Sequence, residues 1–251
     1  MLHSHKWEEL LPEEFNEELQ RAPIAYWACG GMEEHGLHNA LGVDLYLAYD
    51  ICLRAVGISG GIVFPPVPCA PAGWPSYSRE ALRSGKHQLY PPSLWVSREL
   101  CESLYTEILE SIADLGFKSC IALGLHEPAL LLLRQIEEKQ GARIKNMKFW
   151  GGSDRVNLDL IGLGKIRPED RDLAVHAGML ETSLVAACRP DWVDLRRVDR
   201  TSSSPLPLQL KASTPGQIAL VAQATAEFGE ARLSVVSERV ARCALDMAAS
   251  K

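Results

Sequence analysis

Apolar residues occur along the chain in two patterns that alternate at regular intervals. Short apolar runs bounded by glycine or proline predict buried strands at residues 24–28, 62–68 and 118–124. Apolar residues at helical spacing predict helices at residues 44–56, 97–115 and 127–140. This alternation indicates βαβ units, and therefore an α/β fold with a mostly parallel sheet covered by helices on both faces.

The second half of the chain has a weaker pattern. A further strand is predicted at residues 148–150, a helix at 176–188, and one or two helices at 217–247. Residues 70–92 form a long irregular stretch rich in proline, glycine, serine and aromatic residues, and such stretches are usually functional. Neither a repeat nor a linker divides the chain, so we expect one domain spanning residues 1–251.

Composition narrows the classes of function. The 251 residues carry a formal net charge of −6 without a run of Lys or Arg, which argues against nucleic-acid and anionic-membrane partners. The N-terminus lacks the basic start and apolar core of a signal peptide, and apolar runs are too short to span a membrane. The seven cysteines are scattered, which predicts reduced thiols in a cytoplasmic protein.

The candidate chemistry follows two predicted strands. Active sites of parallel sheets lie beyond the carboxyl ends of the strands, where Glu33, His35 and Asp44 follow one strand and His126 follows another. Glu33 and His35 alternate along an extended segment and can point the same way. Carboxylates with imidazoles suit Zn²⁺, Mn²⁺ or Fe²⁺, and a bridging Asp44 could hold two metals about 3.5–4 Å apart. The alternative interpretation is a solvated loop with a turn-stabilising histidine.

Several short motifs follow one another along the chain: Gly-Gly-Met-Glu-Glu-His-Gly-Leu-His at 30–38 and then Asp44, Tyr-Pro-Pro-Ser at 90–93, His126, His-Ala-Gly-Met-Leu-Glu-Thr-Ser at 176–183, and Ala-Thr-Ala-Glu-Phe-Gly-Glu at 224–230. In these residues and this order the chain resembles the creatininase (creatinine amidohydrolase) family. The family's first motif reads roughly Gly-Ser-x-Glu-x-His-Gly-x-His and then Asp, and its Glu, His, Gly, His and Asp all match. The similarity extends from Ile24 to the end of the chain.

This resemblance implies a three-layer α/β/α sandwich, a divalent metal centre with one or two ions per chain, and a homo-oligomer, often a hexamer. Carried over by motif, Glu33, Asp44 and His126 would hold one metal, and His35 and Asp44 the second. His176 corresponds to a histidine that transfers protons in creatininase, so we take it as a candidate catalytic residue.

The chain also departs from the family pattern. Creatininase has a metal-binding glutamate where this chain has Pro128, and many relatives have glutamate where this chain has Met179. The second metal is therefore short of one carboxylate. Glu127 or Glu181 could supply this carboxylate as a metal ligand, and Glu181 is also a candidate catalytic residue beside His176. If neither does, the site holds a single metal ion.

Candidate pocket residues surround these motifs: His38, Trp74, Tyr90, Ser93 and Trp150. His38 could be a ligand, a supporting residue or a substrate contact, and its plainer role is a hydrogen-bonded loop histidine. The aromatic residues have core packing as their alternative role. Gly151 and Gly152, which follow Trp150, could let the backbone approach a ligand closely.

We therefore expect a metal-dependent hydrolase that acts on a small cyclic or carbonyl compound through a metal-activated water. The reaction that we expect first is hydrolysis of the C–N bond of a cyclic amide. Some relatives remove a formyl group from a pyrimidine, and others hydrolyse a C–C bond of a cyclic diketo-inositol. Both reactions are alternatives for this chain. A ligand-binding or scaffold protein with a degenerate metal site is the alternative from another class, since a fold does not guarantee a function.

Overall fold

A five-stranded sheet forms the centre of the computed structural model, which describes residues 2–72, 78, 80–81, 84, 93–152, 156 and 168–250. Its strands stand in the order β2-β1-β3-β5-β4, with bounds β1 Ile24–Ala28, β2 Ile62–Val63, β3 Ser119–Leu123, β4 Arg143–Ile144 and β5 Met147–Trp150. The pairs β1–β2, β1–β3 and β3–β5 are parallel, and only the β4–β5 hairpin is antiparallel. The mostly parallel sheet expected from the sequence is confirmed.

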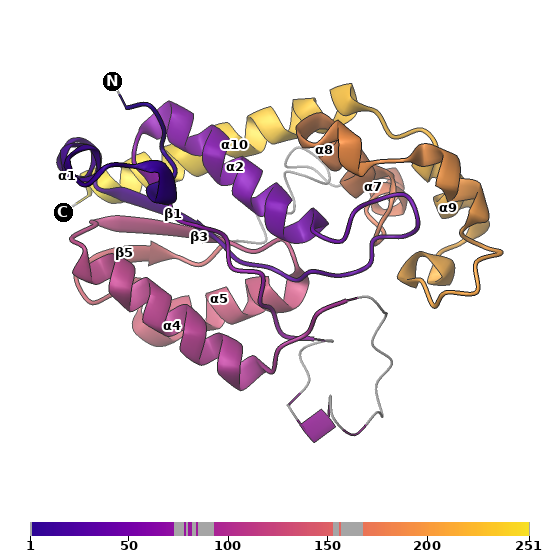
Figure 1. Ribbon diagram of the computed structural model, residues 1–251, viewed down its shortest axis with the longest axis horizontal. Helices are drawn as coiled ribbons and strands as arrows, with labels where there is room; N and C mark the ends of the chain where they lie inside the picture. The colour runs from indigo at the N-terminus through magenta and orange to yellow at the C-terminus, as the bar shows by residue number, and fades with distance from the viewer. Residues whose placement is uncertain are drawn as a thin grey trace.

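Helices cover both faces of this sheet, as the ribbon in Figure 1 shows. One layer contains α2 (Val43–Ser59), α8 (Met179–Cys188) and α10 (Ala226–Ala249). The other contains α1 (Pro12–Arg21), α4 (Arg98–Asp114) and α5 (Glu127–Gln140). The molecule is therefore the predicted three-layer α/β/α sandwich. None of the described helices is long and apolar enough to cross a membrane.

The strands are apolar along their whole length because each faces a helical layer on both sides. Every residue of β1 is buried, with Tyr26 in the core under α2 and Trp27 in the core under α4. The Trp27 ring packs edge-on against Tyr105, with ring centroids 5.2 Å apart. Such buried side chains contribute about 1.5–3 kcal/mol each to the stability of the fold.

A third, smaller apolar cluster lies beyond the sheet. It joins Ala177, just before α8, to Val198, Leu210 and Val221. The last three belong to the η3–α9 segment (residues 195–221), which comprises η3 (Leu195–Arg200), η4 (Gln209–Ala212) and α9 (Pro215–Val221). Other short elements are η1 (Trp7–Glu9), α7 (Pro168–Leu173) and η2 (Pro190–Trp192).

Two local expectations differ from the structure. The strand predicted at residues 62–68 ends at Val63, because prolines at 65, 66 and 68 lack the N–H that a ladder requires. Gly151 faces helix α5 rather than a ligand, since an added Cβ there would overlap the carbonyl of Leu133. Most of the irregular stretch at 70–92, including Trp74 and Tyr90, lies outside the described residues.

A close helix crossing generates a prediction about stability. An added Cβ at Gly229 in α10 would overlap the carbonyl of Ser183 in α8, whereas one at the exposed Gly57 in α2 would meet open space. We expect Gly229→Ala to lower the free energy of unfolding by about 1–3 kcal/mol through overpacking. The matched control Gly57→Ala should raise it by roughly 0.5–1 kcal/mol. Urea denaturation measures both, and equal changes would show that the crossing is not tight.

Candidate functional site

Acidic and imidazole side chains gather at the carboxyl edge of the sheet, as expected from the sequence. Glu33 and His35 lie on the loop that follows β1, and His126 follows β3 and directly precedes α5. Asp44 lies in the first turn of α2. Glu181, in the first turn of α8, belongs to a fourth segment at this edge. The order of the strands along the chain did not predict its position here.

Two glycines let the β1 loop pass through a narrow space. An added Cβ at Gly30 would lie 3.1 Å from the Cα of Leu45 in α2. An added Cβ at Gly31 would lie 3.4 Å from the ring of His126. The backbone therefore runs directly between the start of α2 and His126, which carries Glu33 and His35 to the same place as Asp44.

Glu33, Asp44 and His126 form the first group that could hold a metal ion, with ligand atoms within 4.8 Å of one another. The Nδ1 atom of His126 lies 2.9 Å from Oε1 of Glu33 and 3.4 Å from Oδ2 of Asp44. Its Nε2 atom lies 3.2 Å from the carbonyl oxygen of Pro71, which fixes the ring orientation. All three side chains are buried.

His35, Asp44 and Glu181 form a second such group. The Nε2 atom of His35 lies 3.2 Å from Oδ1 of Asp44 and 3.8 Å from Oε2 of Glu181. Asp44 thus presents Oδ1 to His35 and Oδ2 to His126. One carboxylate faces both groups, which is the arrangement of a bridging ligand.

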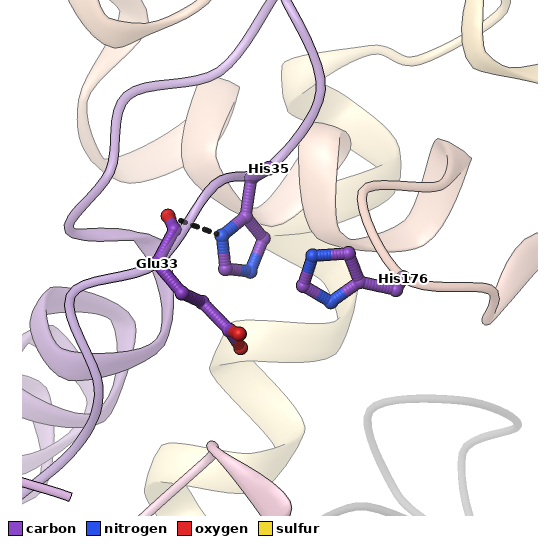
Figure 2. A group of neighbouring side chains, drawn as sticks. All are labelled: Glu33, His35 and His176. Atoms are coloured by element: carbon purple, nitrogen blue, oxygen red, sulfur yellow. Dashed lines mark hydrogen bonds between the residues drawn. The ribbon is translucent and has the colours of Figure 1, made fainter. Parts of the chain in front are cut away.

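A third group brings His176 to the same place, together with Glu33 and His35. Figure 2 shows the two imidazole rings side by side, with the carboxylate of Glu33 near both. The ring centroids of His35 and His176 are 4.3 Å apart. The Nε2–H group of His176 donates to the carbonyl oxygen of Glu34 at 2.7 Å. Its Nδ1 atom is therefore left with the lone pair in the neutral ring.

The carboxylates determine the charges of the two central imidazoles. Burial alone would lower the pKa of His35, but the charges of Asp44, Glu181 and Glu33 raise it to about 10. Burial likewise opposes protonation of His126, and its contacts with Asp44 and Glu33 raise its pKa to about 10. Despite its burial, Asp44 has a pKa well below its usual range because both imidazoles face it. Burial raises the pKa of Glu181.

Glu127 and Glu181, the two candidates for the missing carboxylate, are in different environments. Glu127 is the exposed first residue of α5 and belongs to none of the three groups of described residues. Glu181 is half-buried, and its Oε2 atom accepts the backbone N–H of Ala177 at 2.6 Å. Of the two, only Glu181 lies beside His35 and Asp44.

Two of the candidate pocket residues, Ser93 and Trp150, have supporting contacts. Ser93 Oγ accepts the backbone N–H of Glu34 at 3.0 Å, so it holds the loop that carries Glu33 and His35. Trp150 pairs with Ile121 at the end of β5 and packs against the core under α2. Trp74 and Tyr90 fall outside the described residues.

The sequence did not predict the contacts of two residues near the site, Gln209 and Thr182, although Thr182 lies within the motif at 176–183. Gln209 of η4 donates its side-chain amide to Glu33 at 3.2 Å. Thr182 accepts from the side-chain amide of Asn39 at 3.0 Å and lies 3.1 Å from Nε2 of His38. Neither residue type at its position forms a spacing pattern with the ligands, so only the folded chain brings them together.

His38 is buried but belongs to none of the metal-holding groups of described residues. Its Nε2–H group donates to the carbonyl oxygen of Ala177 at 3.2 Å. Ala177 has a φ of 56°, a left-handed conformation that costs a non-glycine residue about 1–2 kcal/mol. His38 therefore holds the strained turn between His176 and Glu181 rather than a metal.

The buried His38 generates a prediction about pH. Burial lowers its pKa from 6.5 to about 4. Between these values the unfolded chain takes up a proton that folded His38 does not, so the stability of the fold falls as the pH drops from about 6.5 to 4. The loss should approach roughly 3 kcal/mol relative to His38→Gln, which keeps an amide donor for Ala177 but does not titrate. Urea denaturation of both proteins with a chelator present measures this difference, and parallel pH profiles would contradict it.

Comparison with known proteins agrees with this fold. The chain matches the creatininase family, described as creatinine amidohydrolase, over residues 8–244. A creatinine amidohydrolase of Pseudomonas putida is 26% identical over 232 residues, which cover 84% of this chain and 85% of that protein.

Two solved structures have the same fold. A mutant creatininase of the Zn–Zn type has a TM-score of 0.66 at 21% identity and covers 99% of this chain and 100% of its own. The structure called creatininase Mn also has a TM-score of 0.66 at 21% identity, with 98% and 100% covered. The chain therefore belongs to the creatininase family of metal-dependent amidohydrolases.

Proposed function

We propose that this protein holds two divalent metal ions, zinc or manganese, and uses them to hydrolyse a C–N bond of a small cyclic amide. Glu33, Asp44 and His126 would hold one ion, and His35, Asp44 and Glu181 the other. The observation that carries the proposal is the placement of Asp44, whose two oxygens face the two histidines at 3.2 and 3.4 Å. The zinc and manganese creatininases of the same fold support the choice of metals.

The donor set fits such ions. Each group combines carboxylate oxygens with imidazole nitrogen, which suits zinc and manganese better than calcium or magnesium. Three buried acidic side chains, Glu33, Glu34 and Asp44, together with the half-buried Glu181, concentrate negative charge that a cation would offset. When bound, the metal pair supplies an activated water and polarises a carbonyl group.

The chain's own residues have distinct roles in this reaction. Asp44 fixes the spacing of the two groups, because its carboxylate is shared between them. His176 keeps its proton on Nε2 through the bond to Glu34, so Nδ1 is the atom that accepts a proton and passes it to the leaving nitrogen. The left-handed turn at Ala177 places His176 and Glu181 on the same side of the site.

The charge of the loaded site favours a neutral substrate. Two divalent ions would balance the four acidic side chains Glu33, Glu34, Asp44 and Glu181, while the histidines would bind as neutral rings. A site without net charge suits a neutral amide, and its cations would face the negative charge that develops on the amide oxygen during hydrolysis. Burial of the ligands suits a small molecule rather than a polymer.

Metal content and turnover test this function together. We expect protein stripped with chelator and reloaded to hold about two zinc or manganese ions per chain and to open cyclic amides such as creatinine analogues. Glu181→Gln should retain one ion and lose activity by roughly 10²-fold or more, because it removes a direct ligand of the second ion. Elemental analysis and a ring-opening assay measure the two quantities.

Glu127→Gln is the matched control, since it changes the neighbouring candidate carboxylate outside the metal groups. It should keep two ions and full turnover. If Glu127→Gln lost one ion and Glu181→Gln kept both, Glu127 would be the ligand instead of Glu181. The metal-loaded protein could instead open no amide but deformylate a pyrimidine or cleave a cyclic diketone. That result would support the proposed metal centre and contradict the proposed substrate.

We also propose that the protein forms a homo-oligomer. Leu94, exposed beside the site loop, and Leu206, exposed in the η3–α9 segment, are large apolar side chains that an interface would cover. The resemblance to the creatininase family, from which a homo-oligomer was expected, supports this proposal. Light scattering on the metal-loaded protein measures its mass, and a monomer of 27.7 kDa would contradict this proposal.

A further inference from the structure

Both carboxylate oxygens of Glu33 are engaged, each by a different segment of the chain. Oε1 faces Nδ1 of His126 at 2.9 Å. Oε2 accepts a hydrogen bond from the side-chain amide of Gln209 at 3.2 Å. The carboxylate of Glu33 is therefore held in one orientation, with Oε1 toward Asp44 and His126 and Oε2 toward η4.

Gln209 is itself held from two directions. Its backbone N–H donates to Oε1 of Glu34 at 2.6 Å, so side chain and backbone bind two successive glutamates. The next residue, Leu210, is fully buried in the small cluster with Ala177, Val198 and Val221. The amide of Gln209 therefore reaches Glu33 from a fixed position rather than from a free loop.

Glu34 connects this contact to the rest of the site. Its second carboxylate oxygen accepts the backbone N–H of Gly36 at 3.0 Å, and its carbonyl accepts from His176 at 2.7 Å. The η3–α9 segment and the His176 turn thus hold the same short stretch of backbone, from which Glu33 and His35 project.

The chemistry of an amide suits this position. A neutral amide donor orients a carboxylate without cancelling its charge, whereas an Arg or Lys would compete with a metal for that charge. An amide also keeps its donor throughout the working range of pH. Partners of this kind set the orientation of ligating carboxylates, and their loss commonly weakens metal binding by about 10–100-fold.

We propose that Gln209 is a positioning residue that leaves Oε1 of Glu33 as the single ligand oxygen and so sets the affinity of the first metal group. The inference rests on the proposed metal centre. It assigns to the side-chain amide of Gln209 control over one metal only, because among the contacts of the described residues that amide binds Glu33 but neither His35 nor Glu181.

Zinc affinity measured by competition with a chromogenic chelator tests this inference on the full chain. Gln209→Met has similar length but lacks the amide, and Gln209→Asn keeps the amide but is one methylene too short to reach Glu33. In both variants we expect one of the two zinc steps to weaken about 10–100-fold and the other to stay unchanged. The visible spectrum of the Co²⁺-loaded protein should change too, since the coordination of one ion changes.

Gln223→Met is the matched control, because Gln223 is exposed just after α9. It should bind both ions like the unmodified protein. Cooperative thermal unfolding of each metal-free variant confirms that the fold is intact. Unchanged zinc steps in folded Gln209→Met, or equal weakening of both steps, would overturn the role of Gln209 while the metal centre stands. Failure of the unmodified protein to bind zinc would overturn the metal centre, and this inference with it.

Discussion

The carboxylate of Asp44 lies buried between two imidazoles, and the organisation of the site depends on this contact. A buried carboxylate is costly unless it is paired. Without metal, His35 and His126 supply the compensating charge, which is why carboxylates raise the pKa of each to about 10. With the proposed metals bound, the same rings would lose their protons and act as ligands. The chain would thus have two ways of balancing one charge, and loading with metal would exchange one for the other.

The parallel sheet makes this arrangement possible. Strands β1 and β3 are neighbours and end at the same edge, so His126 comes to face Glu33 although 93 positions separate them. The apolar cores on both faces hold these strand ends rigidly. The close passage of Gly30 past α2 then leaves little freedom for the loop between the strand and Asp44.

Much of this could be predicted from the sequence, because it depends on local spacing. Strand ends, the Glu33–His35 alternation and the start of α2 are short-range features, and they placed four of the clustered side chains. The choice between Glu127 and Glu181 could not be made in this way. It depends on how α8 packs against α2 and α10, a tertiary contact that leaves no periodic signal. Gln209 is a common residue type in an irregular segment, and nothing but its folded position distinguishes it.

The resemblance to creatininase implies a ligand glutamate where this chain has Pro128, and this departure has a consequence for how the two proposed ions are controlled. With Glu181 as ligand, the second ion depends on α8 and on the strained turn at Ala177, which also carries His176. The first ion depends on α5 through His126 and on η4 through Gln209. His176, the proposed proton-transferring group, and the second proposed ion therefore depend on the same element. A displacement of that turn would disturb both together, and through the hydrogen bond from His176 to Glu34 it would also reach the loop that carries Glu33.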